Sequence, residues 1–346
     1  MNKNLKAVEH GFALGKFMPL HAGHVHMLRV AEQMSEKLTI MVCSLPTEPI
    51  PGLARVEWVR QLFPKANVVH LAEVIPQEPS EHPQFWDIWR ETIRRLVEKP
   101  IDGVFASETY GWRLASELEA KFFPVDRARQ MIPVSGTAIR ENPYQNWQYL
   151  PEPVKPYFVK RVAIVGPESV GKSTLAKKLG KHFNTIWVEE YARQLFDEMV
   201  EEKVRAPGEF WYEDLETVAR GQQAIEHSLA HQANKVLITD TDVLTTMTWA
   251  DYLYGKHEPW FEEVAKKQSY DLTLLLRPEG TQHIQDGGRV MVEQDTRVRF
   301  ADALERNLKR FRRPYLVLDE SQDTRFKTAI NAIESLFKTS NGHIPE

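Results

Sequence analysis

Residues 166–174 constrain this chain more than any other stretch, because they match the pattern G-x-x-x-x-G-K-[ST] at every fixed position. A β-branched run, 160–165, precedes them, and apolar residues at helical spacing continue over 175–183. Strand, glycine loop and helix in this order predict a parallel α/β sheet. We expect the loop to wrap its backbone N–H groups around phosphate oxygens, with the positive end of the helix dipole directed at the anion.

The side chains of this loop have separate predicted tasks. Lys172 places a cation beside the phosphates of ATP, and Ser173 offers its hydroxyl to Mg²⁺. The other predicted nucleotide-binding residues of the loop are Gly166, Glu168, Ser169, Gly171 and Thr174. A plain glycine turn is the alternative interpretation, but the flanking strand and helix favour a phosphate loop.

The loop lies near the middle of 346 residues, so the half before it needs a domain of its own at about 150 residues per domain. A net charge of −4 with both signs interspersed predicts no nucleic-acid partner. The single cysteine, Cys43, lies in an apolar run and is expected in a buried strand, without disulfide or zinc-cluster chemistry. No signal core and no apolar window of about 20 residues is present, so we expect a cytoplasmic enzyme with no membrane contact.

A second motif opens the N-terminal half, where residues 15–24 read Gly-Lys-Phe-Met-Pro-Leu-His-Ala-Gly-His. Two histidines three apart at a predicted helix start place both imidazoles on one face, where they can donate to phosphate oxygens. A pair of surface histidines is the alternative, and the complete string argues against it. The predicted site residues here are Gly15, Lys16, Phe17, His21, Gly23 and His24.

A third motif, Ser-Gly-Thr-Ala-Ile-Arg over 135–140, opens another predicted helix. Ser135 can cap this helix, Thr137 belongs to the same predicted nucleotide-binding segment, and Arg140 can pair with a triphosphate. Alone, this stretch would be read as a capped helix. Together with the histidine motif of residues 15–24, it resembles the paired signatures of the nucleotidyltransferases that adenylylate small phosphate-bearing substrates.

Between these motifs, strands and helices alternate, which predicts a doubly wound parallel sheet with ligands at the carboxyl ends of its strands. Strands are expected at 11–17, 38–44, 67–71 and 103–107, with helices near 53–63 and 83–98. The predicted organisation is a Rossmann-like domain at 1–142, a proline-rich linker at 143–158, a phosphate-loop kinase domain at 159–338 and a tail at 339–346.

Carboxylates follow two predicted strands of the C-terminal domain. The strand 185–188 ends in Glu189 and Glu190, with Arg193 shortly after, and 235–239 leads into Asp240 and Asp242. At such strand ends a carboxylate can hold Mg²⁺ or orient an acceptor hydroxyl. Asp240 is favoured as metal ligand or base and Asp242 is second, whereas surface glutamates are the alternative reading for the pair at 189–190.

Further expected elements complete this domain. Residues 208–232 predict a polar-faced helix, and 243–255 carry Trp249, which either covers a bound substrate or packs in the core. The last strand and helix are expected at 315–318 and 325–337.

The strand 271–276 ends in Arg277 and a polar, glycine-containing loop that reaches Arg289. This loop resembles the mobile lid of adenylate-kinase-like enzymes, in which arginines close over the transferring phosphoryl group. Arg289 and Arg277 are the candidates, whereas Arg297 and Arg299 are expected on a solvated helix face.

Taken together, the motifs of residues 11–337 resemble the NadR family of bifunctional ribosylnicotinamide kinases and nicotinamide-mononucleotide (NMN) adenylyltransferases. The resemblance rests on segments 15–24, 135–140, 166–174, 237–242 and 286–289, in that order. It implies that the C-terminal domain phosphorylates N-ribosylnicotinamide with ATP. It also implies that the N-terminal domain then joins NMN to the adenylyl group of ATP, which gives NAD and pyrophosphate.

The resemblance also implies how the residues share this work. The substrate phosphate is itself the nucleophile of the adenylyl step, so the N-terminal residues position groups and stabilise charge; they are His21, His24, Lys16 and Arg140. In the kinase step Lys172, Mg²⁺ and Arg289 stabilise charge, and a carboxylate among Glu189, Glu190 and Asp240 orients the ribose 5′-hydroxyl.

Some members of this family carry an additional DNA-binding helix-turn-helix domain, and only about ten residues precede the first expected strand. We therefore expect no repressor activity from this chain, small-molecule partners only, and leave a homo-oligomer open. One alternative is a fused phosphopantetheine adenylyltransferase and dephospho-coenzyme A kinase. Another is a nucleotide-sensing regulatory module, against which Asn234-Lys235 continues with Val236 instead of completing N-K-x-D.

Overall fold

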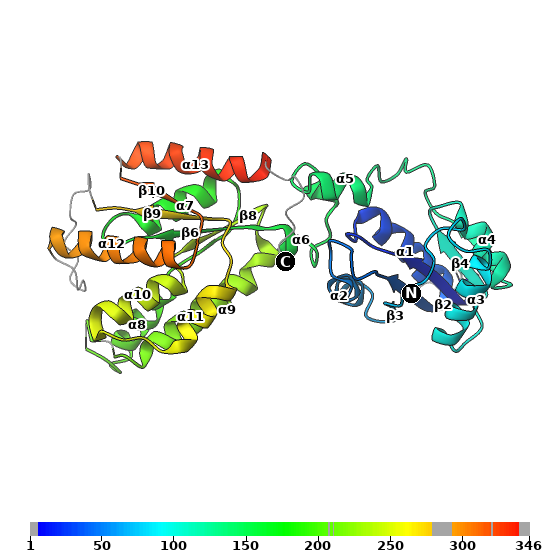
Figure 1. Cartoon of the computed structure of the whole chain (residues 1–346), viewed down its shortest axis with the longest axis horizontal. Helices are drawn as coiled ribbons and strands as arrows, with labels where there is room; N and C mark the ends of the chain where they lie inside the picture. Colours follow the sequence, from blue (N-terminus) through cyan, green and yellow to red (C-terminus); the bar gives the residue numbers. More distant parts are fainter. Residues whose placement is uncertain (1–5, 207, 210, 279–292, 320, 339–346) are drawn as a thin grey trace. The chain divides into compact units, whose positions relative to one another are not determined.

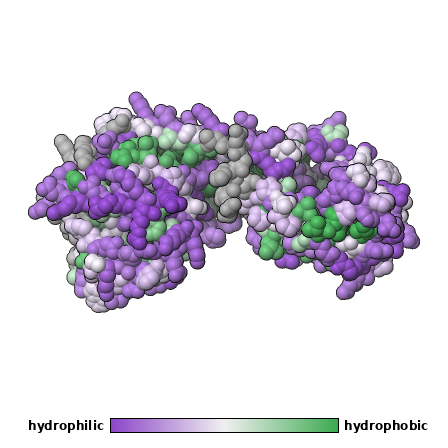
Figure 2. All heavy atoms as spheres, viewed as in Figure 1, coloured by the Kyte–Doolittle hydropathy of each residue, from purple (hydrophilic) through white to green (hydrophobic). Residues whose placement is uncertain are grey.

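A computed structural model describes residues 6–338 except 207, 210, 279–292 and 320. The chain divides after Val154 into two compact units, and each contains its own five-stranded parallel sheet (Figure 1). Within the described ranges no helix is long and apolar enough to cross a membrane. Hydrophilic residues cover most of the face that Figure 2 shows on both units, although hydrophobic patches are visible on each.

The sheet of the N-terminal unit has the order β3-β2-β1-β4-β5, with every strand pair parallel. Its strands are β1 (Val8–Gly15), β2 (Ser35–Cys43), β3 (Asn67–Leu71), β4 (Gly103–Ala106) and β5 (Lys121–Pro124). Because β1 lies between β2 and β4, the strand order reverses there, and the crevice at its carboxyl end is where such sheets bind ligands. The first histidine motif follows β1 directly.

Helices flank this sheet and close its core. They are α1 (Ala22–Met34), α2 (Gly52–Leu62), α3 (Phe85–Leu96), α4 (Tyr110–Glu117), α5 (Gly136–Glu141) and the 3-10 turn η2 (Trp147–Tyr149). Phe12 of β1 and Met41 of β2 pack in one buried cluster with Trp89 of α3, and the Trp89 indole N–H donates to the carbonyl of Pro76 at 2.9 Å. Cys43 is buried at the end of β2, as expected.

The sheet of the C-terminal unit has the order β10-β9-β6-β8-β7, and it is also parallel throughout. Its strands are β6 (Lys160–Val165), β7 (Trp187–Val188), β8 (Val236–Asp240), β9 (Leu272–Leu276) and β10 (Tyr315–Leu318). Here β6 lies between β8 and β9, so the phosphate loop that follows it opens at the point where the strand order reverses.

The helices of this unit lie on both sides of its sheet, with α7 and α13 on one side in Figure 1. They are α6 (Lys155–Phe158), α7 (Lys172–His182), α8 (Tyr191–Glu201), α9 (Asp214–Leu229), η3 (Ala230–Gln232), α10 (Val243–Tyr254), α11 (Pro259–Lys267), α12 (Gln294–Arg310) and α13 (Gln322–Lys338).

Parts of the structure differ from the sequence-based expectations. The elements α4, β5, α6, α8, α10 and α11 were not predicted, and the helix expected over 208–232 begins only at Asp214. The expectation of a solvated face for Arg297 is wrong, because its side chain is fully buried in α12. It lies on the same helix stripe as buried Phe300 and Leu304, at a spacing of three and four residues, whereas Arg299 is exposed.

The proline-rich segment after Asn142 is packed. Tyr144 and Trp147 are both buried, and their rings lie parallel at 6.3 Å between centroids. The segment also forms η2 and α6. The aromatic residues of this segment therefore pack in the protein, while the domain limits at 142 and 159 stay a prediction.

Candidate functional sites

The histidine motif of residues 15–24 forms the turn from β1 into α1. Phe17 has a φ of +47°, and its buried ring meets the ring of His24 edge-on at 5.1 Å. His21 caps α1 by accepting the His24 N–H at its Nδ1 over 3.4 Å, and the two imidazoles stack at 3.7 Å between centroids. A Cβ on Gly23 would lie 3.1 Å from the ring of His21, so glycine permits this close packing. The structure thus brings the two predicted histidines together.

Both imidazoles are held in the neutral form. Burial, together with the nearby charge of Arg129, lowers the pKa of His21 to about 4. Burial, His21 and Arg129 together bring the pKa of His24 well below its usual value. A neutral imidazole carries one N–H, so at pH 7 each ring can donate a hydrogen bond to a phosphate oxygen without changing its charge.

Residues 135–140 begin α5, which contacts the histidine motif of residues 15–24. Ser135 caps the helix by accepting the Ala138 N–H at 3.1 Å. A Cβ on Gly136 would lie 2.8 Å from the carbonyl oxygen of Met18, so only glycine lets the two backbones approach this closely.

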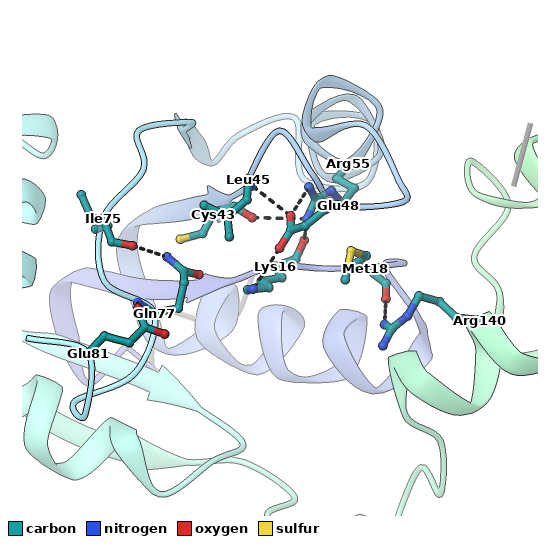
Figure 3. Close-up of polar contacts among 10 residues, drawn as sticks. All are labelled: Lys16, Met18, Cys43, Leu45, Glu48, Arg55, Ile75, Gln77, Glu81 and Arg140. Carbon is teal, nitrogen blue, oxygen red and sulfur yellow. Dashed lines mark hydrogen bonds and ion pairs between the residues drawn. The ribbon is translucent and has the colours of Figure 1, made fainter. Parts of the chain in front are cut away.

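Arg140 joins the two N-terminal motifs directly. Its guanidinium donates to the carbonyl of Met18 at 2.5 Å (Figure 3). It also donates to the Thr137 hydroxyl at 3.1 Å. Residues more than 120 positions apart in the chain therefore meet at one place, as the paired signatures predicted.

Lys16 is held by two residues that sequence reasoning missed. Its ammonium pairs with Glu48 at 2.9 Å, and the buried Arg55 donates to the same carboxylate at 2.7 Å (Figure 3). Arg55 also donates to the carbonyls of Lys16 at 2.8 Å and Cys43 at 3.3 Å. Burial opposes ionisation of Glu48, but hydrogen bonds from Lys16, the Leu45 N–H and Arg55 outweigh it and lower its pKa. This network fixes Lys16 beside the carboxyl ends of β1 and β2.

The phosphate loop of the C-terminal unit has the backbone that its glycines predict. Gly166 and Gly171 have φ values of +148° and +91°, and Ser169 has +63°. A Cβ on Gly166 would lie 2.4 Å from the carbonyl oxygen of Leu276, so the loop packs directly on the end of β9. Glu168 lies in the loop itself, and Lys172, Ser173 and Thr174 form the first turn of α7.

Asp240 is the last residue of β8 and lies beside Lys172 and Ser173 of the phosphate loop. Burial and the charge of Glu190 raise its pKa, Lys172 and a hydrogen bond from Ser173 oppose the rise, and the resulting pKa is about 6. Among the described residues its Oδ1 is buried without a hydrogen-bond partner. Asp240 and Ser173 therefore fit Mg²⁺, which prefers a few hard oxygen ligands beside substrate phosphates. The ammonium of Lys172 currently donates to the carbonyl of Pro167 at 2.9 Å.

A second candidate carboxylate, that of Glu190, follows the end of β7. Glu190 is half-buried and pairs with Arg193 at 3.5 Å, whereas Glu189 is exposed. The buried Gln222 of α9, which sequence reasoning missed, accepts the Tyr191 N–H at 2.8 Å and donates to the Asp240 carbonyl at 3.4 Å. It thereby fixes the start of α8 against the end of β8.

Two predicted substrate residues make contacts that stabilise the fold. Asp242 is fully buried and caps α10, because its Oδ1 accepts the N–H and the hydroxyl of Thr245, each at 2.8 Å. Trp249 packs against Phe300 at 4.6 Å between ring centroids. Their substrate role stays a prediction.

Of the two predicted lid arginines, Arg289 lies outside the described residues. Arg277 is half-buried, and its guanidinium pairs with Asp302 at 2.6 Å and Glu305 at 3.0 Å, both on α12.

Comparisons with known proteins agree with this division. Residues 12–142 match the cytidylyltransferase-like family and residues 161–325 match an AAA domain family. The chain is 30% identical to the trifunctional NAD biosynthesis/regulator protein NadR of Escherichia coli (strain K12), over 94% of this chain and 83% of that protein. The chain belongs to the NadR family.

Other relatives fit this membership. The NadR protein of Salmonella typhimurium (strain LT2) is 28% identical over 94% of this chain and 83% of its own. A crystal structure of a NadR protein in complex with NAD and AMP-PNP superposes with a TM-score of 0.78 at 24% identity, over 97% of this chain and 98% of that one. A NadR protein in complex with NR superposes with a TM-score of 0.74 at 22% identity, over 99% of each chain. The predicted family and the fold of two parallel-sheet units are thus confirmed.

Proposed function

We propose that this chain catalyses two consecutive steps of NAD synthesis. The C-terminal unit phosphorylates N-ribosylnicotinamide with ATP to NMN, and the N-terminal unit adenylylates NMN with ATP to NAD and pyrophosphate. The observation that carries this proposal is that one chain of the NadR family holds two candidate nucleotide sites. Arg140 joins the two motifs of the first site, and Asp240 lies beside the phosphate loop in the second. The complexes of the related structures, with NAD, AMP-PNP and NR, support the same substrates.

In the adenylyl step a phosphate oxygen of NMN attacks the α-phosphorus of ATP. The bond from that phosphorus to the bridging oxygen breaks, and pyrophosphate leaves with the electron pair. Because NMN supplies the nucleophile, the unit needs only to align the reactants and stabilise negative charge. The neutral rings of His21 and His24 donate hydrogen bonds, while Lys16 and Arg140 supply positive charge.

In the kinase step the 5′-hydroxyl of ribosylnicotinamide attacks the γ-phosphorus of ATP, and ADP leaves. The hydroxyl proton passes to a carboxylate, for which Glu190 is better placed than exposed Glu189 because its charge acts directly on Asp240. Asp240 and Ser173 would hold Mg²⁺, which when bound neutralises phosphate charge. Lys172 adds a second cation. ATP and Mg²⁺ as cofactors and a cytoplasmic location belong to the same proposal.

The test is to incubate the purified protein with ATP, Mg²⁺ and either ribosylnicotinamide or NMN, and to follow NAD by chromatography. NAD should form from both substrates. Lys172→Ala should abolish only the ribosylnicotinamide route, and His24→Ala should abolish NAD formation from both. Consumption of phosphopantetheine with no NAD from either substrate would refute the proposal and support the coenzyme A alternative.

A further inference from the structure

Arg325 lies on α13 near the phosphate loop and has no role in the mechanism so far. Its side chain is 2% exposed. One guanidinium nitrogen donates to the carbonyl of Val170 at 3.1 Å, and another donates to the carbonyl of Arg277 at 2.7 Å. Val170 is the residue before Gly171 of the phosphate loop, and Arg277 is the residue after β9. A single buried fork therefore connects the loop with the end of a central strand.

The contact with Val170 determines where the next N–H points. Among the described residues the only cis peptide bond is Met18-Pro19, so the bond between Val170 and Gly171 is trans. In a trans peptide the C=O and the N–H point in opposite directions. Because Arg325 holds the Val170 oxygen, the Gly171 N–H is directed to the opposite side of the peptide plane. A phosphate loop binds its anion with such N–H groups, and a carbonyl rotated toward the phosphates would repel them.

The second contact of Arg325, with the Arg277 carbonyl, is to a backbone segment that other elements also hold in place. The Arg277 N–H donates to the carbonyl of Leu318 at 3.2 Å, and its guanidinium pairs with Asp302 and Glu305 of α12. The backbone at this point is thus held from β10, α12 and α13 together. The loop itself already touches the end of β9 at Gly166, so Arg325 adds a second attachment at the other end of the loop.

We propose that Arg325 is a positioning residue for phosphoryl transfer, which presents the Gly171 N–H to the phosphates of ATP by holding the Val170 carbonyl against the end of β9. This inference rests on the proposed kinase function of the C-terminal unit. Arg325 acts through the loop backbone.

The test is Arg325→Lys, because an ammonium keeps the charge but lacks the planar fork that reaches two carbonyls. The KM for ATP in ribosylnicotinamide phosphorylation should rise about tenfold, the effect of losing one oriented hydrogen bond to a charged group, with kcat nearly unchanged. The matched control is Arg313→Lys. Arg313 is also buried and donates to a carbonyl, that of Ala265 at 2.7 Å. NMN adenylylation by the same preparation should stay at the wild-type rate.

A merely structural role would lower kcat and the melting temperature and leave the KM for ATP unchanged, and that result overturns the proposal. An equal rise in KM for Arg313→Lys overturns it as well. Titration with Mg-ADP by calorimetry needs no acceptor, so it separates this inference from the proposed substrate. Weaker ADP binding in Arg325→Lys alone supports the positioning role even if wild-type protein phosphorylates no ribosylnicotinamide. If Arg325→Lys does not fold, Arg325→Gln is measured in the same way.

Discussion

Replacing Glu48 with glutamine should destabilise the N-terminal unit and weaken its ATP site at the same time. The carboxylate is 7% exposed and pairs with Lys16 at 2.9 Å and Arg55 at 2.7 Å. Arg55 is completely buried, so the loss of its only anionic partner among the described residues leaves an uncompensated charge inside the protein. Its remaining bonds go to the carbonyls of Lys16 and Cys43.

The size of the effect follows from this burial. Breaking a buried ion pair by removing one partner costs about 3 to 5 kcal/mol, and we expect the lower end because the carbonyl contacts of Arg55 persist and glutamine can accept one hydrogen bond. For a unit of this size about 3 kcal/mol corresponds to a fall in melting temperature of roughly 6 to 12 °C. Since Lys16 loses its anchor, the KM for ATP in NMN adenylylation should also rise.

The assay is thermal unfolding with both activities measured on the same preparation. The control is Glu73→Gln, which removes an exposed pair with Arg95 at 2.7 Å and should change neither property measurably. Kinase activity reports on the C-terminal unit and should remain at the wild-type level at low temperature. Equal melting temperatures for Glu48→Gln and Glu73→Gln would refute the reasoning, because the burial of Arg55 would then carry no energetic consequence.

Three further predictions test the two sites separately. Because the pKa of Asp240 is about 6 and that of His21 about 4, kinase kcat/KM should fall as pH decreases through about 6. The histidines should cause no such fall in adenylylation between pH 5 and 7, and coincident pH profiles would contradict this. Gly136→Ala places a Cβ 2.8 Å from a backbone oxygen, so adenylylation should fall by roughly tenfold to a hundredfold with kinase activity unchanged; equal loss of both activities would point to misfolding instead. Asp240→Asn should abolish kinase activity and raise the melting temperature of the C-terminal unit at pH 7 without Mg²⁺. A pKa of about 6 instead of 3.8 corresponds to a penalty of up to about 3 kcal/mol on the ionised form. This penalty is present above pH 6 and vanishes below the unfolded-state pKa, so an unchanged or lower melting temperature at pH 7 would count against it.

The sequence predicted those parts of the fold and sites that depend on local backbone geometry. Three local features require particular residues at fixed spacing: the phosphate loop, the turn between β1 and α1, and the cap at Ser135. Each can therefore be recognised within ten residues of sequence. The central strands, such as β6 and β8, can also be recognised from the sequence. They are buried on both faces and therefore consist of largely continuous apolar runs.

Residues whose role comes from contacts between distant segments could not be found in this way. Glu48 and Arg55 lie in a proline-containing stretch without a motif, and their importance arises only when α2 folds against the ends of β1 and β2. Gln222 is an ordinary helix residue until Tyr191 and Asp240 approach it. Arg297 is a different case, since helical spacing to Phe300 would have revealed its buried face and its charge was given too much weight.

Burial of titratable side chains has opposite consequences at the two proposed sites. In the N-terminal unit burial keeps His21 and His24 neutral, and Arg140 and the anchored Lys16 supply positive charge, so the proposed site suits an anionic triphosphate without a change of protonation. In the C-terminal unit burial and Glu190 instead raise the pKa of Asp240, which means that its ionised form is unfavourable until a cation arrives. A divalent ion that enters with ATP would remove this repulsion and bind tightly for that reason. In the proposed mechanism the carboxylate that costs stability in the free protein would therefore couple metal binding to nucleotide binding.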